Sequence, residues 1–158
     1  MLLKRGTKGG KMNKEELDKI LEDHKEWLKD KSKGKRADLS NVEFSEVTIR
    51  DEDLRYSILI GAKFDDSLFV NVDFSHSDLS NCDFNNSNFV KCKFFKADCS
   101  NSRFEYSGFE DCELKIVNFE NACLAYAVIE DSKIDYCKFD NADLKHTKIV
   151  KNLEINKG

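Results

Sequence analysis

The chain has 158 residues, of which 40% are hydrophobic and 35% charged, and it contains no proline. This composition is typical of one soluble domain, and no apolar run approaches the roughly 18 residues that a membrane-spanning helix needs. The basic N-terminus MLLKRGTKGG is not followed by an apolar segment, as a secretory signal would be. We therefore expect a cytoplasmic protein without membrane contact, whose six cysteines are reduced thiols.

Charge is distributed unevenly along the chain. Residues 1–36 carry 12 Lys and Arg against 7 Asp and Glu, whereas residues 37–151 carry 13 against 22. The head and the body are therefore electrostatically different. Direct nucleic-acid binding is not expected, because the basic residues are concentrated in the head.

Residues 1–12 lack any pattern and are expected to be a disordered leader. The stretch KGGKM before and including Met12 can be encoded by a purine-rich ribosome-binding sequence followed by a start codon. This suggests that Met12 is the native start and that the preceding residues are not native.

Residues 13–36 are expected to form a capping helix and a linker. Asn13-Lys14-Glu15-Glu16 has the form of a capping box, in which Asn13 is the N-cap. His24 lies in an apolar stripe at helical spacing and is expected to be packed rather than to bind a ligand. We expect the stripe to cover the open end of the following domain; a partner-binding helix is the alternative. The other members of the stripe are Leu17, Ile20, Leu21, Trp27 and Leu28.

From Ala37 to Lys151 the chain divides without a gap into 23 pentads. The third residue of each, here called the centre, is Phe, Leu or Ile except at Cys99, and 11 of the 12 Phe are centres. The residue two before the centre is small or Val except at Glu52. Because side chains alternate along an extended chain, the centre and this small residue point inward together. Such short units must stack on copies of themselves, so a solenoid is expected.

The pentads ADLSN (37–41), SDLSN (77–81), ADCSN (97–101) and ADLKH (142–146) resemble the pentapeptide-repeat family, which is bacterial in many members. The resemblance implies an all-β, right-handed quadrilateral parallel β-helix over residues 37–151, with four pentads per coil, preceded by the α-helical cap. Residues 152–158 then form a C-terminal tail. Stacked aromatic ladders are expected to form the core: Phe44, Phe64, Phe84 and Phe104 in one, and Phe69, Phe89 and Phe109 in another.

Nothing in the pattern indicates catalysis, so we expect no enzyme, no cofactor and no metal site. Cys92 and Cys112 should stack on adjacent coils, close enough for a disulfide, although buried thiols acting as small hydrophobes are the better interpretation. Cys123 alone is expected to face solvent. Glu52 occupies an inward position, where it either turns to solvent or has a partner that the sequence does not identify.

Four pentads per coil define four faces. The first face has centres 39, 59, 79, 99, 119 and 139; the second, third and fourth follow at 44, 49 and 54 with the same spacing. The first and second faces each carry a net outward charge of −4. The candidate acidic interaction residues are Asp38, Asp78, Asp98, Glu120 and Asp140 on the first face, and Glu43, Asp65, Asp83, Glu105 and Asp143 on the second.

Two further surfaces are candidates for partner binding. Outward apolar side chains occur at Leu68, Val70 and Val90 on the third face and at Ile58 and Ile60 on the first, either as a docking patch or as dispersed surface residues. The C-terminal coil leaves an open β edge, so a homodimer through it is a second possibility.

The sequence favours a non-enzymatic protein-interaction scaffold whose partner it does not name. The alternative follows from the resemblance, because some members bind the DNA topoisomerase gyrase as duplex-DNA mimics and protect it from quinolones. Solvation alone is the competing explanation of the acidic faces.

Overall fold

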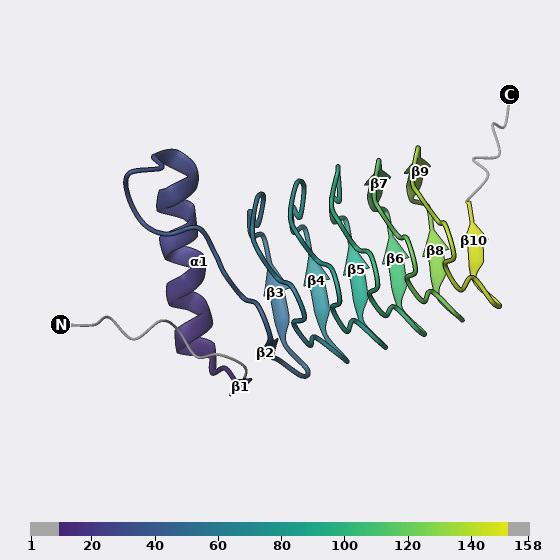
Figure 1. The fold of residues 1–158 in the computed structure, drawn as a ribbon, viewed down its shortest axis with the longest axis horizontal. Coiled ribbons are helices and arrows are strands. Elements are labelled where there is room, and N and C mark those ends of the chain that lie inside the picture. Colours follow the sequence, from purple (N-terminus) through teal and green to yellow (C-terminus); the bar gives the residue numbers. More distant parts are fainter. Residues whose placement is uncertain (1–9, 152–158) are drawn as a thin grey trace, which may run out of the picture.

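The computed structural model describes residues 10–151, and these form a parallel β-solenoid with one helix at its N-terminal end (Figure 1). The predicted β-helix with an N-terminal helical cap is confirmed. A left-handed backbone position recurs every five residues and parallel ladder partners lie twenty residues apart, which makes four sides per coil.

The helix α1 (Lys14–Lys29) begins at the capping box. The Asn13 side chain accepts a hydrogen bond of 2.9 Å from the Glu16 backbone N–H, and the Glu16 carboxylate accepts one of 3.1 Å from the Asn13 N–H. Leu17, Leu21 and His24 are buried, and both leucines join the core of the first coil. The amphipathic stripe therefore closes the N-terminal end of the solenoid.

A short strand precedes the helix. β1 (Gly10–Lys11) pairs in parallel with β2 (Val42–Glu43) on the second face. Residues 10–12 fall within the segment expected to be a disordered leader, and this pairing arises because the first coil leaves its lower edge open. The remainder of the leader, residues 1–9, and the tail 152–158 lie outside the described residues.

The third face is the most regular side of the solenoid. Its six-stranded parallel sheet runs in the order β10-β8-β6-β5-β4-β3, and each strand pairs with the one twenty residues away (Figure 1). The fourth face has a two-stranded parallel sheet, β7 (Glu113–Lys115) with β9 (Lys133–Asp135). The six strands are β3 (Thr48–Arg50), β4 (Leu68–Val70), β5 (Asn88–Val90), β6 (Gly108–Glu110), β8 (Val128–Glu130) and β10 (Lys148–Val150).

Aromatic ladders fill the interior. Phe64 and Phe84 stack with ring centroids 5.6 Å apart, and Phe69 and Phe89 stack at 4.9 Å. Rings on adjacent faces meet edge to face, as Phe64 and Phe69 do at 5.5 Å, which is a favourable geometry for aromatic pairs. The seven expected core rings, Phe44, Phe64, Phe84, Phe104, Phe69, Phe89 and Phe109, are all at most 6% exposed.

The core opens at the C-terminal end. Leu144 and Ile149, the centres of two pentads in the last coil, are 44% and 61% exposed. Their side chains point inward like the other centres, but no described coil covers them. This end therefore presents both apolar side chains and an unpaired strand edge.

Candidate interaction surfaces

Each coil turns its corners through left-handed residues. The last residue of every pentad from Asn41 to His146 has a positive φ, and Gly61 is the one glycine among them. Asn tolerates this conformation better than other non-glycine residues. The Asn column on the corner after the first face is therefore explained by backbone geometry: Asn41, Asn81, Asn101, Asn121 and Asn141.

Several of the candidate acidic residues stabilise the turns. A carboxylate oxygen of Asp78 accepts a hydrogen bond from the Ser80 backbone N–H at 3.0 Å, and Asp98 accepts one from Ser100 at the same distance. Asn118, in the next coil, makes the equivalent bond with its amide oxygen at 3.1 Å. One oxygen of each such Asp is thus used by its own turn. Asp38, Asp83 and Asp143 accept the same bond.

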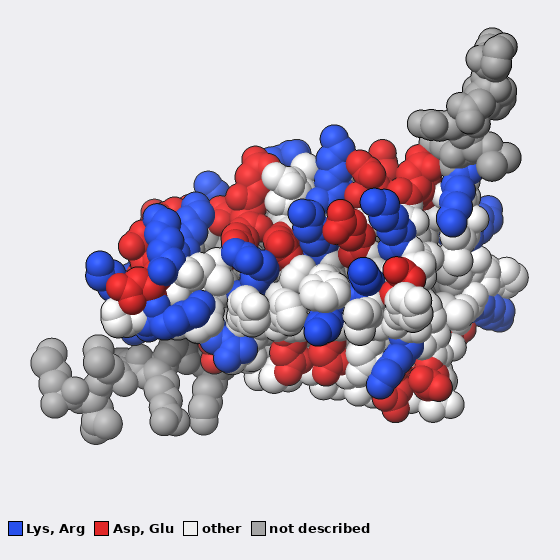
Figure 2. All heavy atoms as spheres, turned by 90° about the horizontal axis from the view of Figure 1, so that it is seen from above, with Lys and Arg blue, Asp and Glu red and all other residues white. Residues whose placement is uncertain are grey.

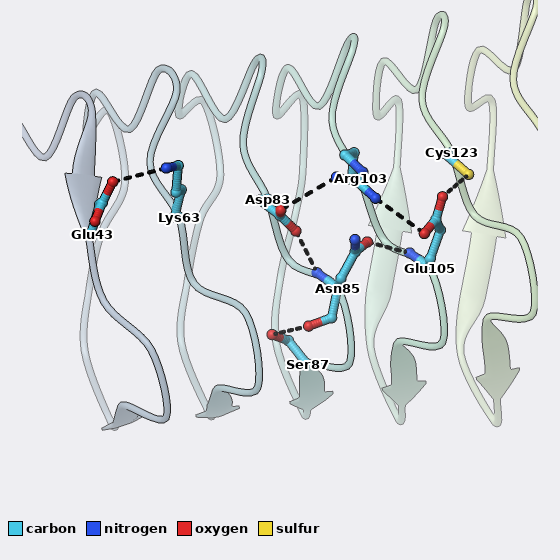
Figure 3. Close-up of polar contacts among 8 residues, drawn as sticks. All are labelled: Glu43, Lys63, Asp83, Asn85, Ser87, Arg103, Glu105 and Cys123. Carbon is cyan, nitrogen blue, oxygen red and sulfur yellow. Dashed lines mark hydrogen bonds and ion pairs between the residues drawn. The ribbon is translucent and has the colours of Figure 1, made fainter. Parts of the chain in front are cut away.

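Charges on the second face are partly neutralised along the solenoid axis (Figure 3). Lys63 lies 2.8 Å from Glu43, and its ammonium lowers the pKa of that carboxyl. Arg103 contacts Asp83 at 3.7 Å and Glu105 at 3.2 Å. The Lys63–Glu43 and Arg103–Asp83 pairs join adjacent coils at the spacing of the parallel ladder, whereas Arg103 and Glu105 are two residues apart in the same coil.

The first face differs from the second. Among the described residues, no ion pair involves Asp38, Asp78 or Asp98, although Asp98 accepts a hydrogen bond of 3.2 Å from the Asn118 amide. Glu120 and Asp140 continue this face as exposed residues. Of these acids, only Asp78 and Asp98 are direct ladder partners on this face, because Ile58 separates Asp38 from Asp78 and Asn118 follows Asp98. On the second face Asp65 is half-buried and Asp143 exposed.

The fourth face carries charges of both signs. Figure 2 views the molecule from above relative to Figure 1, on the side where β7 and β9 lie, and shows Lys and Arg interspersed with Asp and Glu. A shallow open hollow of about 330 Å³ lies at the corner between the third and fourth faces and is lined by Asp51, Asp73, Lys91 and other polar residues. Within residues 10–151, no group of three or more His, Cys, Asp or Glu could hold a metal ion.

The expected apolar residues divide into two groups. Leu68 and Val70 on β4 and Val90 on β5 are half-buried neighbours on the third face, where Val70 and Val90 are direct ladder partners. Ile58 is half-buried and Ile60 is 37% exposed, and both lie on the first face between coils that carry carboxylates. Only the third-face group, here called the valine patch (Leu68, Val70 and Val90), belongs to a continuous sheet.

One exposed aromatic column was missed in the sequence. Tyr106 and Tyr126 stack at 4.9 Å, and Tyr126 stacks on His146 at 4.8 Å. These residues follow one corner between the second and third faces, and Tyr106 is 60% exposed. Their twenty-residue spacing was the available signal.

The cap helix is joined to the solenoid by polar contacts. His24 is fully buried; its Nδ1 accepts a hydrogen bond from the Ala37 backbone N–H, and its Nε2 lies 3.0 Å from the Arg55 carbonyl oxygen. Since Nδ1 must accept, the neutral ring protonated on Nε2 satisfies both partners. Burial lowers the pKa of His24.

Glu52 has a partner on the cap helix. Its carboxylate lies 3.7 Å from the Lys25 ammonium, and its side chain is 18% exposed. Burial is the main cause of its raised pKa, which the nearby Lys25 opposes. The inward acid is thus accommodated because the helix supplies a cation where the first coil has no lower neighbour.

All six cysteines are free thiols. Cys92 and Cys112 are buried, and their Sγ atoms lie 3.4 Å and 3.2 Å from the carbonyl oxygens of Phe69 and Phe89. Burial raises the pKa of Cys82 to about 12, so that thiol is unreactive. Cys123 and Cys137 are both half-buried. Cys123 points outward, with its Sγ 3.2 Å from a Glu105 carboxylate oxygen. Cys137 keeps the inward position, with its Sγ 3.1 Å from the Leu114 carbonyl oxygen, and is partly exposed because no described coil covers it.

Comparison with known proteins identifies the family. Residues 53–86 and 73–105 match the family model described as pentapeptide repeats (8 copies). The chain belongs to this pentapeptide-repeat family and is a repeat scaffold. No curated protein matches the sequence. Within the described residues, no helix is long and apolar enough to cross a membrane.

Several solved structures are similar to the chain. Rfr23, a pentapeptide repeat protein from the cyanobacterium Cyanothece 51142, matches at 15% identity over 72% of this chain and 84% of that protein, with a TM-score of 0.46. HetL from Nostoc sp. strain PCC 7120, involved in heterocyst differentiation regulation, matches at 16% over 86% and 72%, with a TM-score of 0.32. QnrB1, a plasmid-mediated fluoroquinolone resistance protein, matches at 16% over 77% and 79%, with a TM-score of 0.27. None of these similarities identifies a partner for this chain.

Proposed function

We propose that the protein is a non-enzymatic scaffold that binds another protein through the valine patch. The observation that carries this proposal is the position of three half-buried apolar side chains on a flat six-stranded sheet, with exposed charged residues at both ends of the patch. Adjacent apolar residues on an exposed face are a common form of protein-binding site. The six free thiols support a reducing compartment such as the cytoplasm, and the resemblance supports a bacterial host.

Affinity capture from the native host tests the scaffold. Val70→Glu and Val90→Glu should each abolish capture of a protein that the wild type retains, because a carboxylate would be desolvated at the contact. Val128→Glu is the matched control, since Val128 is exposed on the same face but outside the patch. A partner that is retained equally by all four proteins would contradict a role for the valine patch.

A second candidate function is mimicry of duplex DNA toward a topoisomerase such as gyrase, with quinolone protection as a consequence. The observation that favours it is the acidic character of the first face, where Asp38, Asp78 and Asp98 have no bound cation among the described residues and Asp78 and Asp98 are direct ladder partners. The second face has the same net charge, but its Glu43, Asp83 and Glu105 carboxylates are ion-paired.

A gyrase supercoiling assay, with and without a quinolone, tests the mimic. Asp78→Asn with Asp98→Asn should remove inhibition or protection, since Asn keeps the turn and removes the charge, as Asn118 demonstrates. Asp73→Asn is the control, because Asp73 makes the same turn bond at 2.9 Å on the fourth face. An absence of any effect of the wild type on supercoiling would exclude gyrase as the target.

A further inference from the structure

The third face has an ordered distribution of charge along its axis. The outward column of successive ladder partners reads Arg50, Val70, Val90, Glu110, Glu130 and Val150. Arg50 and Glu110 are exposed and Glu130 is half-buried, and no ion pair involves Arg50 or Glu110 in the described part of the chain. The first five levels of the column thus run from basic through apolar to acidic, and the apolar Val150 follows in the last coil.

The column is complementary in charge to the same column of a second copy that runs in the opposite direction. We place a second copy on the third face with its solenoid axis reversed. The two copies are then related by a two-fold axis that is parallel to the strands and passes between the coils of Val70 and Val90. This axis sets Val70 against Val90 of the second copy. The same operation sets Arg50 against Glu110 of the second copy, and it does so twice. Arg50 and Glu110 then meet their opposite charges and Val70 meets Val90, whereas Leu68 faces the Asn88 amide of the second copy.

Other arrangements of two copies are disfavoured. With parallel solenoids whose third faces overlap fully, the two-fold axis exchanges the two outward columns, so Arg50 would face Thr48 of the second copy and Glu110 would face Gly108. Neither charge would then meet an opposite charge. Shifting the antiparallel register by one coil toward the C-terminus sets Val70 against Glu110 of the second copy, and shifting it toward the N-terminus sets Val90 against Arg50, so each shift places a charged group on an apolar one. Only the register centred between Val70 and Val90 pairs Arg50 with Glu110 and Val70 with Val90.

The neighbouring column is compatible with this register. Thr48 would face Gly108 of the second copy, where the missing side chain leaves space, although the Asn88 amide lies above that glycine. At the margin of the face, Asp51 would approach Asp111 of the second copy, which opposes association. The apolar centre and the Arg50–Glu110 pairs determine the orientation.

We propose that the third face is a self-association surface, on which the valine patch is covered by a second, antiparallel copy of this chain. This inference rests on the proposed docking role of the valine patch and names its occupant. Four coils at about 4.8 Å and roughly 10 Å of strand length give about 200 Å² of flat area per copy. That is well below a standard interface, so association is weak, with a dissociation constant on the order of 100 µM.

Sedimentation equilibrium over a range of concentrations that reaches several times this value tests the proposal. Arg50→Glu and Glu110→Arg should each weaken association by about ten-fold, because each places two like-charge pairs in the interface. The double variant should restore association to within about three-fold of the wild type, since it exchanges the charges within both pairs. Lys115→Glu, an exposed charge reversal on the fourth face, is the control and should have no effect.

The outcomes separate this inference from the proposed scaffold. A monomeric wild type whose capture of another protein is lost in Val70→Glu would overturn self-association and leave the scaffold standing. Association that Ile149→Glu removes and Arg50→Glu leaves unchanged would place the contact at the C-terminal coil, and would overturn the third-face dimer. If Val70→Glu alters neither association nor capture, both proposals fail. Every substituted position here is partly or fully exposed, so the variants should fold.

Discussion

The aspartate in the second position of a pentad combines a local structural task with a surface charge. Asp78 holds its turn through one carboxylate oxygen, and the second oxygen remains available to solvent or to a partner. Its stability contribution therefore resides in an acceptor atom and not in its charge.

This separation gives a prediction for Asp78. Asp78→Ala should lower the free energy of unfolding by about 1 kcal/mol, which is typical for the loss of a side-chain acceptor of a backbone N–H. Asp78→Asn should change it by only a few tenths of that, because the amide oxygen accepts the same bond. Urea denaturation of the two variants beside the wild type measures the difference, and equal losses would contradict a turn-stabilising role.

His24 gives the molecule a predictable response to acid. Burial lowers its pKa in the folded protein from 6.5, so the unfolded chain binds more protons below that pH. The contribution of neutral His24 to stability is complete above about pH 6.5 and is lost as the pH falls toward the lowered folded pKa. Protonation would also turn Nδ1 into a donor that faces the Ala37 N–H donor.

The free energy of unfolding should therefore fall between pH 7.5 and 5.5, as read from urea denaturation midpoints. His24→Gln cannot titrate and should have a flatter profile. That comparison is needed because Glu52, whose pKa is raised, contributes with the opposite sign and favours folding as the pH falls. Parallel pH profiles for the wild type and His24→Gln would refute the role of His24.

At the scale of elements, the stacked ladders distribute stability unevenly along the axis. Phe84 and Phe104 stack at 5.2 Å in the middle of the solenoid. Phe139 stacks on Phe119 at 5.3 Å but has no ring above it and is half-buried.

Phe84→Ala should therefore cost about 3–5 kcal/mol, because it removes a fully buried ring and leaves a cavity between two coils. Phe139→Ala should cost less than half of that, since solvent already reaches the site. Thermal and urea unfolding of the two variants provide the comparison. A similar loss for both would mean that the last coil is covered in solution.

The repeat and the ends differ in how far the sequence determines them. The pentad pattern predicted a solenoid and its inward residues because one large and one small residue recur with a fixed phase, as at Phe64 and Ala62, and the family resemblance implied that the solenoid is a β-helix. It did not predict that Asp78 is engaged in a turn, that Lys63 neutralises Glu43 or that Lys25 meets Glu52. Those contacts join neighbouring coils or the helix to a coil, and they depend on side-chain directions that a period of five does not encode.

At the scale of the whole molecule, the helix α1 protects one end of a rod whose other described end is open. Leu17 and Leu21 complete the core beneath the first coil, where Leu39 and Leu54 would otherwise be exposed. The helix thus prevents the lower edge from pairing with other chains.

Removal of residues 1–36 should lower the melting temperature and cause concentration-dependent association, because it uncovers apolar centres and unpaired backbone groups together. Size-exclusion chromatography with light scattering and a thermal melt are sufficient to detect both effects. A truncated protein that stays monodisperse and melts at the wild-type temperature would show that the first coil needs no cover.

The uniform left-handed corners also constrain how such a chain can change its length. Inserting a single residue would shift every later residue of that coil by one position. A corner residue would then occupy an inward position and a centre would face solvent, so the ladder contacts of that coil would be lost. Inserting or deleting one complete coil would leave each remaining side chain on its own face, with neighbours of the same kind. The gene can therefore lengthen or shorten the rod by duplicating or losing a segment that encodes a whole coil, and the spacing of surface groups on either side of the change would be preserved.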